Sequence, residues 1–360
     1  MNVLFLIDHA PDYREEFFRC LGEKCNLTVV SHPCEPDGLS NPFKRINYHY
    51  IELQNFKIGP FLYANLSHVH LSDYDVICAD LNPRHFWRFL LFLKDRSNRK
   101  KWIWWGHIYG RSNNVILNFM RRQFLIRSAA ILAYSKSIAN RARTEAGNVP
   151  VLSINNSQTK KEDFLVLEWP DSEDLHFIFV GRPQKRKRLD RILRLAESFP
   201  NTKWRLIGPD MYEFIHKNFD KIPNNIECFG KTTGPDLEKH FSWCHAVVNP
   251  GHLGLLVSNA ALHGRPVLIQ KNENHAPEIA LAEDSNQLFL DFDNIVETEI
   301  FFTDLRNDYS VLKEAAQRLQ KTAKSEYTIE HMVEKHMEAF KIAYSERKKI
   351  NTIKIKIWNY

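Results

Sequence analysis

Short, uninterrupted apolar runs recur along this chain, and segments with helical spacing separate many of them. Continuous rather than alternating apolar residues are typical of strands that are buried on both faces. The pattern therefore predicts parallel sheets covered by helices. The expected strands are Val3–Ile7, Leu27–Val30, Val76–Ala79, Trp102–Trp105, Ile131–Ala133, Leu175–Val180, Lys203–Ile207, Ile226–Phe229, Ala246–Asn249 and Pro266–Ile269.

The alternation pauses between Ser153 and Asp174, where the residues are polar and include a proline. We interpret this stretch as a linker, so the chain is expected to form two doubly wound, Rossmann-like α/β domains, 1–160 and 161–330. A last helix, Ile329–Arg347, is expected to cross back to the first domain, with a basic tail completing 331–360. Ligands bind at the carboxyl ends of parallel strands, so the residues just after strands are the candidates for a site.

The lack of a recognisable signal peptide and the spacing of the cysteines lead us to expect a cytoplasmic protein. The start, MNVLFLIDHAPDYREEFF, has too short an apolar run for a signal peptide, and no basic segment precedes it. No apolar run reaches the length that a membrane-spanning helix needs. The six cysteines show no CxxC pair and no zinc spacing, so we expect reduced thiols.

The net charge of +6 is modest, but basic residues gather in one part of the first half. They are Arg84, Arg88, Lys94, Arg96, Arg99, Lys100, Lys101, Arg111, Arg121, Arg122 and Arg127. Apolar side chains interleave with them in HFWRFLLFLKDRSNRKKWIWW. This fits either a solvated helix face beside a buried strand or a surface that lies on an anionic membrane. No nucleic-acid recognition motif accompanies the charge, so nucleic acid is not an expected partner.

The segment FVGRPQKRKRLDRIL suggests an anion site. A strand ends at Val180, Gly181 turns the chain, and a helix begins near Leu189. Arg182 and Lys187 lie in the loop between them. Arg forks onto phosphate oxygens and Lys acts as a point charge, so both are expected to hold a pyrophosphate. The dinucleotide and P-loop glycine motifs are absent.

A second phosphate site is expected in NPGHLGLLVSNAALHGRPVLI. Pro250 and Gly251 turn the chain after a strand, and Gly254 is expected to begin a helix through about His263. The first N–H groups of a helix, here around Gly254 and Leu255, are free to bind a phosphate. Glycine lets the ligand approach the backbone closely.

Two further candidates follow strands. Glu278 lies at the start of a short helix after Pro277, where it could bind sugar hydroxyls or cap the helix. His107 follows the strand Trp102–Trp105, where it could donate to a sugar or phosphate, act as a base, or be structural. Asp73 and Asp75 match the letters of a metal-binding DxD motif, but they precede a strand, so we assign them to a turn.

Taken in order, these segments resemble the retaining glycosyltransferases of the GT-B fold, specifically family four. The resemblance is closest between Phe177 and about Leu290. The matching features are Gly181-Arg182 followed by Lys187, the glycine-rich helix start at Gly254, the helix end Gly264–Val267, and Pro277-Glu278. In the first domain, His107 matches a histidine at the cleft. The stretch YREEFF, which includes Tyr13 and Arg14, is similar to the first-helix start of polysaccharide-assembly members.

The chain departs from this family at one motif. The family usually carries two glutamates around the glycine-rich helix start, and the aligned residues here are Gly251 and Asn259. In the family the first contacts the donor sugar and the second the ribose. Asn259 can still hydrogen-bond a ribose hydroxyl. Gly251 cannot replace a carboxylate, so we expect its role to pass to Glu278 or to backbone amides.

The resemblance implies a retaining, metal-independent hexosyltransferase with a nucleotide diphosphate sugar as donor and no separate cofactor. Arg182, Lys187, His107 and Glu278 are its expected catalytic residues; Gly181, Gly251, Gly254, Leu255, Asn259, Tyr13 and Arg14 are expected to bind substrates. The implied acceptor is a lipid-linked bacterial surface glycan, such as lipopolysaccharide O-antigen or capsule, at the inner face of the cytoplasmic membrane. Two alternatives stay open: an inactive nucleotide-sugar-binding subunit of a transferase complex, and a GT-B enzyme of another reaction type, such as an epimerase or phosphorylase.

Overall fold

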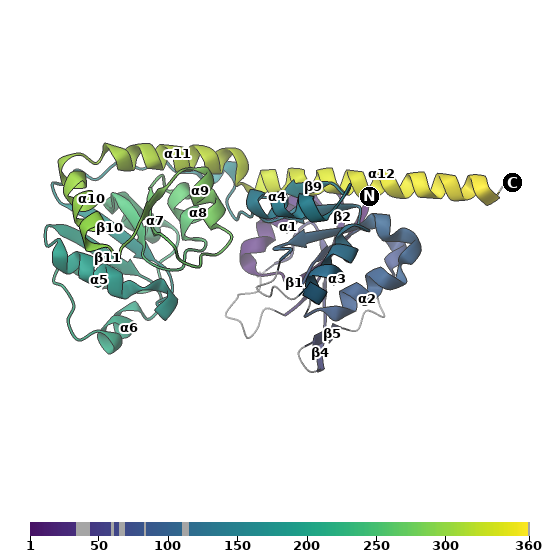
Figure 1. The fold of residues 1–360 in the computed structure, drawn as a ribbon, viewed down its shortest axis with the longest axis horizontal. Helices are drawn as coiled ribbons and strands as arrows, with labels where there is room; N and C mark the ends of the chain where they lie inside the picture. The colour runs from purple at the N-terminus through teal and green to yellow at the C-terminus, as the bar shows by residue number, and fades with distance from the viewer. Residues whose placement is uncertain (34–43, 59–60, 65–68, 83, 110–114, 359–360) are drawn as a thin grey trace. The chain divides into compact units, whose positions relative to one another are not determined.

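The computed structural model describes residues 1–33, 44–58, 61–64, 69–82, 84–109 and 115–358. The contacts divide the chain into two compact units (Figure 1). Unit 1 comprises Met1–Gln158 and Thr328–Tyr360, and unit 2 comprises Thr159–Tyr327. Each unit has its own parallel sheet and its own buried apolar clusters.

Unit 1 is built on a seven-stranded parallel sheet of order β3-β2-β1-β6-β7-β8-β9. Its strands are β1 (Asn2–His9), β2 (Asn26–His32), β3 (His49–Glu52), β6 (Val76–Asp80), β7 (Trp102–Gly106), β8 (Ala130–Ala133) and β9 (Val151–Ser153). A hairpin pairs β4 (Asn55–Ile58) with β5 (Phe61–Ala64). The helices are α1 (Glu15–Gly22), α2 (Phe86–Lys94), α3 (Val115–Leu125), α4 (Lys136–Glu145) and α12 (Ile329–Trp358). Short 3-10 helices are η1 (Asp12–Arg14), η2 (Leu71–Asp73) and η3 (Arg96–Lys101).

Unit 2 has a six-stranded parallel sheet of order β12-β11-β10-β13-β14-β15. Its strands are β10 (Leu175–Val180), β11 (Thr202–Ile207), β12 (Ile226–Phe229), β13 (Ala246–Asn249), β14 (Val267–Gln270) and β15 (Leu288–Leu290). The helices are α5 (Leu189–Ser198), α6 (Met211–Asn218), α7 (Pro235–Trp243), α8 (Leu256–Leu262), α9 (Ile279–Asp284), α10 (Ile295–Asn307) and α11 (Ser310–Glu326). The turns are η4 (Lys161–Asp163) and η5 (Lys185–Lys187).

The ten strands predicted from the apolar runs are all present, and the prediction of doubly wound α/β sheets is confirmed. The central strands are buried on both faces, as continuous apolar runs require. The sequence analysis missed the edge strands β3, β9 and β15, the hairpin of β4 and β5, and the helices α3, α6 and α10. Ser153, assigned to the linker, is the last residue of β9.

The end of the chain differs from the prediction. The last helix was expected to end at Arg347, but α12 continues to Trp358. No glycine or proline occurs between Ile329 and Trp358, so nothing in the sequence stops a helix that has already formed. Within unit 1, α12 packs on α1 and on β8, and Met332 and Phe340 join the apolar cluster around Phe5 (Figure 1).

Candidate functional site

In unit 2, the loop after β10 is bonded to the loop after β13. The backbone N–H of His252 donates to the carbonyl of Arg186 at 2.8 Å. The Nζ of Lys187 donates to the carbonyl of His252 at 2.6 Å. The cationic loop and the glycine-rich loop, which the sequence treats as two separate anion sites, therefore form one structure. Burial lowers the pKa of Lys187 to about 8, with a further contribution from Arg186, so this ammonium group stays mostly charged at neutral pH.

Gly251 lies where these two loops touch, and it is buried. A Cβ atom at this position would lie 2.4 Å from the carbonyl oxygen of Arg186 and 2.7 Å from the carbonyl carbon of Lys187. Both are backbone atoms, so no side chain fits without moving the chain. The position where the resemblance expects a glutamate is thus closed to every residue except glycine by the packing of the cationic loop.

The start of α8 offers backbone N–H groups, although it begins later than predicted. The sequence analysis placed the helix start at Gly254, but α8 spans Leu256–Leu262. The residues before α8 stay outside the helix because Leu253 bonds to another loop. The N–H of Leu253 donates to His275 Nδ1 at 3.1 Å, and the carbonyl of Leu253 accepts from Ala276 N at 2.9 Å. No described residue accepts a hydrogen bond from the N–H of Gly254, Leu255 or Leu256. A Cβ on Gly254 would meet nothing within 4 Å, so the space beside these groups is open.

The other predicted residues of unit 2 lie in the loop after β10, in α8 and at the start of α9. Arg182 is exposed, and the N–H of Gly181 donates to the carbonyl of Ile207 at 2.9 Å. Glu278 is the N-cap residue of α9, and its side chain makes no capping hydrogen bond. Asn259 is half-buried within α8, and its carbonyl accepts from His263 Nδ1 at 2.7 Å.

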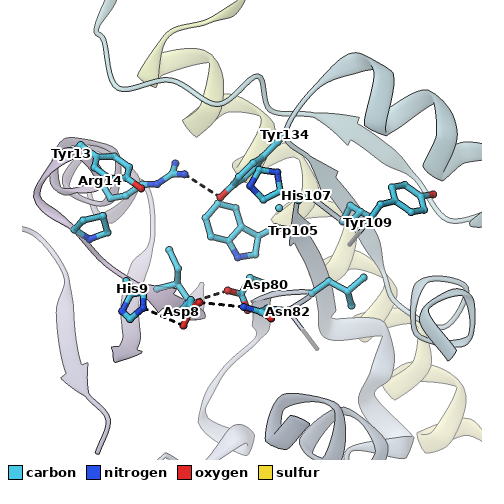
Figure 2. A pocket seen from close by; sticks show the side chains of 15 residues that line it. Asp8, His9, Tyr13, Arg14, Asp80, Asn82, Trp105, His107, Tyr109 and Tyr134 are labelled. Atoms are coloured by element: carbon cyan, nitrogen blue, oxygen red, sulfur yellow. Dashed lines mark hydrogen bonds and ion pairs between the residues drawn. The ribbon is translucent and has the colours of Figure 1, made fainter. Parts of the chain in front are cut away.

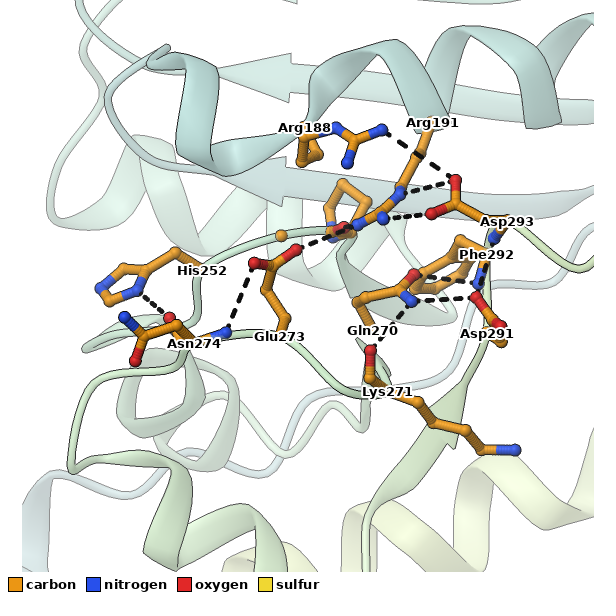
Figure 3. A network of polar contacts seen from close by, with 12 residues as sticks. Arg188, Arg191, His252, Gln270, Lys271, Glu273, Asn274, Asp291, Phe292 and Asp293 are labelled. Atoms are coloured by element: carbon orange, nitrogen blue, oxygen red, sulfur yellow. Dashed lines mark hydrogen bonds and ion pairs between the residues drawn. The ribbon is translucent and has the colours of Figure 1, made fainter.

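A network around Arg191 holds the three loops after β13, β14 and β15 (Figure 3). Arg191 lies on α5, is 5% exposed, and forms an ion pair with Asp293. Its Nη1 donates to the carbonyl of Pro250 at 2.5 Å and to Glu273 Oε2 at 3.3 Å. Because Pro250 directly precedes Gly251, this network fixes the backbone of the glycine-rich loop. The sequence analysis missed Arg191; its signal is an arginine among the buried apolar positions of an amphipathic helix.

In unit 1, a cavity of about 330 Å³ opens at the carboxyl ends of β1, β6 and β7 (Figure 2). It brings together Tyr13, Arg14 and His107, which are the three site residues predicted for the first domain. Its lining also contains Asp8, His9, Asp80, Asn82, Trp105, Tyr109 and Tyr134, which the sequence analysis did not single out. Asp8 and Asp80 lie in the last residues of β1 and β6, so the strand-end rule could have found them.

Arg14 occupies one end of this cavity. It is 4% exposed, and its Nη2 donates to the hydroxyl of Tyr134 at 3.1 Å. The guanidinium lies 5.6 Å from the ring centres of both Trp105 and Tyr134 and 5.4 Å from that of Tyr13. Aromatic faces attract a cation but do not neutralise it.

His107 lies at the same end and is exposed, with its ring centre 4.5 Å from that of Tyr134. The next residue, Ile108, has a φ of 56°, and the N–H of Tyr109 donates to the carbonyl of His107 at 2.5 Å. This is a γ-turn, and a β-branched residue at positive φ is strained. Strain of this kind gathers at functional sites and orients the side chains beside it.

Acidic groups occupy the opposite end of the cavity. Asp8 Oδ1 contacts His85 Nε2 at 2.6 Å, and His85 Nδ1 contacts His32 Nε2 at 3.2 Å. Burial favours protonation of Asp8, but the hydrogen bond and charge of His85 hold its pKa below the ordinary value. Burial lowers the pKa of His32 to about 3. Asp80 forms an ion pair with the buried Arg88, so Arg14 lies at one end of the cavity and two carboxylates that have partners lie at the other (Figure 2).

A surface of α2 and α3 combines exposed apolar side chains with arginines. We call it the basic-apolar face; its members are Leu90, Leu93, Val115, Ile116, Leu117, Phe119, Met120, Arg96, Arg99, Arg122 and Arg127. Leu93, Phe119 and Arg127 line a groove of about 510 Å³ within it. Within the predicted basic cluster, Arg88 and Lys101 are buried and form ion pairs with Asp80 and Asp95, so neither is available to this face. Arg111 lies outside the described residues.

Two negative findings apply to the described residues. No helix there has the length and hydropathy needed to cross a membrane. No group of three His, Cys, Asp or Glu side chains there has the arrangement of a metal site. Asp73 ends η2, and Asp75 accepts from Asn2 N at 2.9 Å and from Arg347 at 2.6 Å, so both have the structural roles that the sequence predicts.

No protein-family model matches the sequence, and no curated protein matches it. Solved structures do match. HepE from Anabaena in complex with UDP is 14% identical with a TM-score of 0.66, and covers 95% of this chain and 100% of its own. A glycosyltransferase from Rickettsia africae is 11% identical with a TM-score of 0.68, covering 95% and 98%. Sucrose-phosphate synthase from Thermosynechococcus elongatus is 12% identical with a TM-score of 0.65, covering 96% and 100%. This chain therefore has the GT-B fold of these glycosyltransferases, as the sequence predicted.

Proposed function

We propose that this chain transfers a sugar from a nucleoside diphosphate sugar to a hydroxyl group, with retention of the anomeric configuration. The observation that supports it is the bonded pair of loops in unit 2. Lys187, the exposed Arg182 and the N–H groups of Gly254 and Leu255 belong to loops at one edge of the sheet. Among the solved neighbours, HepE has been described with UDP and with UDP-glucose.

The chemistry follows from where charge develops. The bond between the anomeric carbon and the diphosphate oxygen breaks, a bond to the acceptor oxygen forms, and the acceptor proton passes to the diphosphate. The leaving diphosphate gains negative charge. Lys187 has one N–H engaged by the His252 carbonyl, which leaves two to donate to that charge. Preorganised donors of this kind stabilise the transition state strongly.

The remaining details are also proposals. Retention, independence from metal ions and a lipid-linked surface-glycan acceptor rest on the family resemblance. Glu278 and Asn259 are proposed to contact the donor sugar and the ribose. Because no side chain fits at Gly251, the contact that the family makes there through a carboxylate passes to Glu278 or to backbone amides.

We further propose that the basic-apolar face binds anionic membranes. Five apolar side chains of α3 are exposed, among them Val115 at 79%, Ile116 at 70% and Phe119 at 62%. Arginines flank them from η3 and from the residues after α3. Exposed apolar side chains with basic residues nearby are typical of a helix that lies in the membrane interface.

The test of activity is incubation with a panel of nucleotide sugars and acceptor lipid extracts, with release of nucleoside diphosphate as the measurement. Arg182→Ala and Lys187→Ala should each reduce turnover by roughly two orders of magnitude or more, because each removes a charge-stabilising group. Lys185→Ala is the matched control, because Lys185 is an exposed cation of the same loop. Unchanged turnover in both site variants would refute the assigned phosphate site. The anomeric coupling in the product and activity in EDTA test retention and metal independence.

The test of the membrane face is sedimentation with vesicles of phosphatidylglycerol and phosphatidylcholine. Replacing Arg96, Arg99 and Arg127 with Gln should weaken binding by about 3 kcal/mol, or about 100-fold, at roughly 1 kcal/mol per arginine. The control replaces Ile295 and Ile300 with Ser, because these exposed apolar residues lie on α10 in unit 2. Equal binding of wild type and the arginine variant would exclude this face.

One observation favours a second function, an inactive nucleotide-sugar-binding subunit. The backbone of the cationic loop fills the place of the family's first glutamate, so the site lacks that carboxylate. Binding of nucleotide sugar without turnover, even with acceptor lipid present, would support the subunit. Turnover that depends on Lys187 would exclude it.

A further inference from the structure

The cavity of unit 1 contains a buried cation that no acid of the described chain neutralises. Arg14 is 4% exposed, and its only side-chain hydrogen bond to a described residue goes to the neutral hydroxyl of Tyr134. Its Nη1 is buried and has no hydrogen-bond partner among the described residues. Leaving a buried guanidinium without a counter-charge costs several kcal/mol, so such a group needs an explanation.

The other buried arginines show what is missing at Arg14. Four arginines are buried among the described residues. Arg88 forms an ion pair with Asp80, and Arg191 pairs with Asp293 and Glu273. Arg265 donates to backbone carbonyls, including those of Phe241 at 2.9 Å and Cys244 at 2.8 Å. Arg14 alone of these four has neither an acid nor a set of carbonyls.

The acids of the cavity are already engaged elsewhere. Asp8 contacts His85 at 2.6 Å and accepts from Asn82 at 3.2 Å, and Asp80 pairs with Arg88. They lie at the end opposite Arg14, as Figure 2 shows. The free Nη1 belongs to a side chain that lines the cavity, next to the exposed His107. An anion that entered the cavity could therefore reach Arg14 and would be repelled from the Asp8 end.

We propose that the acceptor of the sugar transfer carries an anionic group, a carboxylate or a phosphate, that pairs with Arg14, while its hydroxyl groups face Asp8 and Asn82. This rests on the proposed function of unit 2. Arg14 supplies the counter-charge, and Tyr134 fixes the plane of the guanidinium for a forked contact. Carboxylate oxygens accept hydrogen bonds, so the Asp8 end selects ligand hydroxyls. The two ends together orient an acidic sugar unit or a sugar phosphate in one direction.

Binding to the full chain tests this proposal without catalysis. The probes are methyl glucuronide, glucose 6-phosphate and methyl glucoside, measured by calorimetry at constant ionic strength. At least one acidic probe should bind about tenfold or more tightly than the glucoside, as expected for a hydrogen-bonded charge pair. A preference for the glucuronide assigns a carboxylate, and a preference for the phosphate assigns a phosphate. Equal affinities, or no binding of either acidic probe, would overturn the proposal.

Variants link the preference to Arg14. Arg14→Gln should bind the acidic probes no better than the glucoside. Tyr134→Phe, which leaves the charge but removes its hydrogen bond, should weaken the acidic probe about two- to fivefold. Arg143→Gln is the control, because Arg143 is an exposed arginine of unit 1 outside the cavity. Thermal melting shows whether Arg14→Gln is folded, and if it is not, Tyr134→Phe decides: unchanged acid binding in it would count against the site.

Nucleotide binding separates this inference from the proposed function. Arg14→Gln should bind nucleoside diphosphate as the wild type does. If wild type binds nucleotide and transfers sugar equally to acidic and neutral acceptors, the inference fails and the proposed function stands. If wild type binds no nucleotide sugar, the proposed function fails, and the acidic-probe measurement still decides whether Arg14 is an anion site.

Discussion

The two units differ in how their buried arginines are paired. In unit 2, each buried arginine of the described chain has its partners within the protein: Arg191 has Asp293 and Glu273, and Arg265 has backbone carbonyls. In unit 1, Arg88 is paired in the same way, but Arg14 is not. The loops of unit 2 are therefore held in place before any ligand arrives, whereas the cavity of unit 1 keeps a charge for something that enters it.

The two units also differ in backbone strain. In unit 2, the close approach of two loops is made at a glycine, Gly251, where it costs little. In unit 1, the loop that carries His107 turns through Ile108 at a φ of 56°, which costs on the order of 1–3 kcal/mol. This difference fits the proposed roles, in which the loops of unit 2 bind the diphosphate and the cavity of unit 1 binds the acceptor.

The largest effect is expected at Arg191, which holds the loops after β13, β14 and β15 in unit 2. Arg191→Met should lower the free energy of unfolding by about 3 kcal/mol, at the low end for breaking a buried ion pair because Asp293 is half-exposed and regains water. Urea-dependent hydrogen exchange, measured in peptides that cover 246–293, reports this loss.

Arg194→Met provides the matched control for Arg191. Arg194 contacts the same carboxylate, Asp293, at 2.7 Å, but its side chain is 51% exposed. Exposed ion pairs contribute about 0–1 kcal/mol to stability, so this variant should lower the free energy of unfolding by no more than about 1 kcal/mol. Equal losses in the two variants would mean that Asp293, rather than the burial of Arg191, sets the stability of these loops.

A smaller effect is expected in unit 1 as the pH falls. Burial, with a contribution from the charge of Arg14, lowers the pKa of His336 from 6.5 to about 3. Between these values the unfolded chain binds a proton that the folded chain does not, so stability decreases as the pH falls below about 6.5. From pH 7 to 4.5 the part of this loss that comes from His336 should be about 2–3 kcal/mol. Hydrogen exchange in peptides of unit 1 at both pH values measures it.

His336→Phe tests the source of that pH dependence. The ring of His336 packs among Phe5, Phe17 and Trp105, so a phenyl ring suits its surroundings. The variant should lose the part of the pH dependence that comes from His336. His32, whose pKa is also lowered to about 3, should still contribute a similar part in this variant. An unchanged dependence in His336→Phe would mean that other groups control the acid sensitivity of unit 1.

The two units also differ in how much of their structure the sequence predicted. Apolar runs identify buried strands, and Gly181, Lys187 and Gly251 form local motifs, so the fold and the loops of unit 2 could be predicted. The start of α8 could not, because contacts with His275 and Ala276, about twenty residues away in the chain, decide it. The end of α12 was wrong because alternating Ile and Lys suggested a tail, although no helix breaker is present.

In unit 1 the predictable part was smaller. Tyr13 and Arg14 came from the resemblance and His107 from its place after a strand, and the structure brings all three into one cavity. Arg14 has no acidic partner among the described residues, and this depends on the packed chain, because Asp8 and Asp80 make their contacts elsewhere. The contact of Asp8 with His85 joins residues 77 positions apart, and no local pattern records it.

The smallest expected effect is at Gly251, and it tests whether the loops of unit 2 are as fixed as the comparison implies. Gly251→Ala places a Cβ against the backbone of Arg186 and Lys187, so one loop must shift, at about 1–2 kcal/mol for an overpacked contact. Because Lys187 moves with that loop, nucleotide affinity should fall as well. Gly254→Ala should change stability by less than about 0.5 kcal/mol, because the space beside it is open. If Gly251→Ala unfolds like the wild type and binds nucleotide equally well, the two loops can separate, and the preformed site would have to be assembled by the ligand instead.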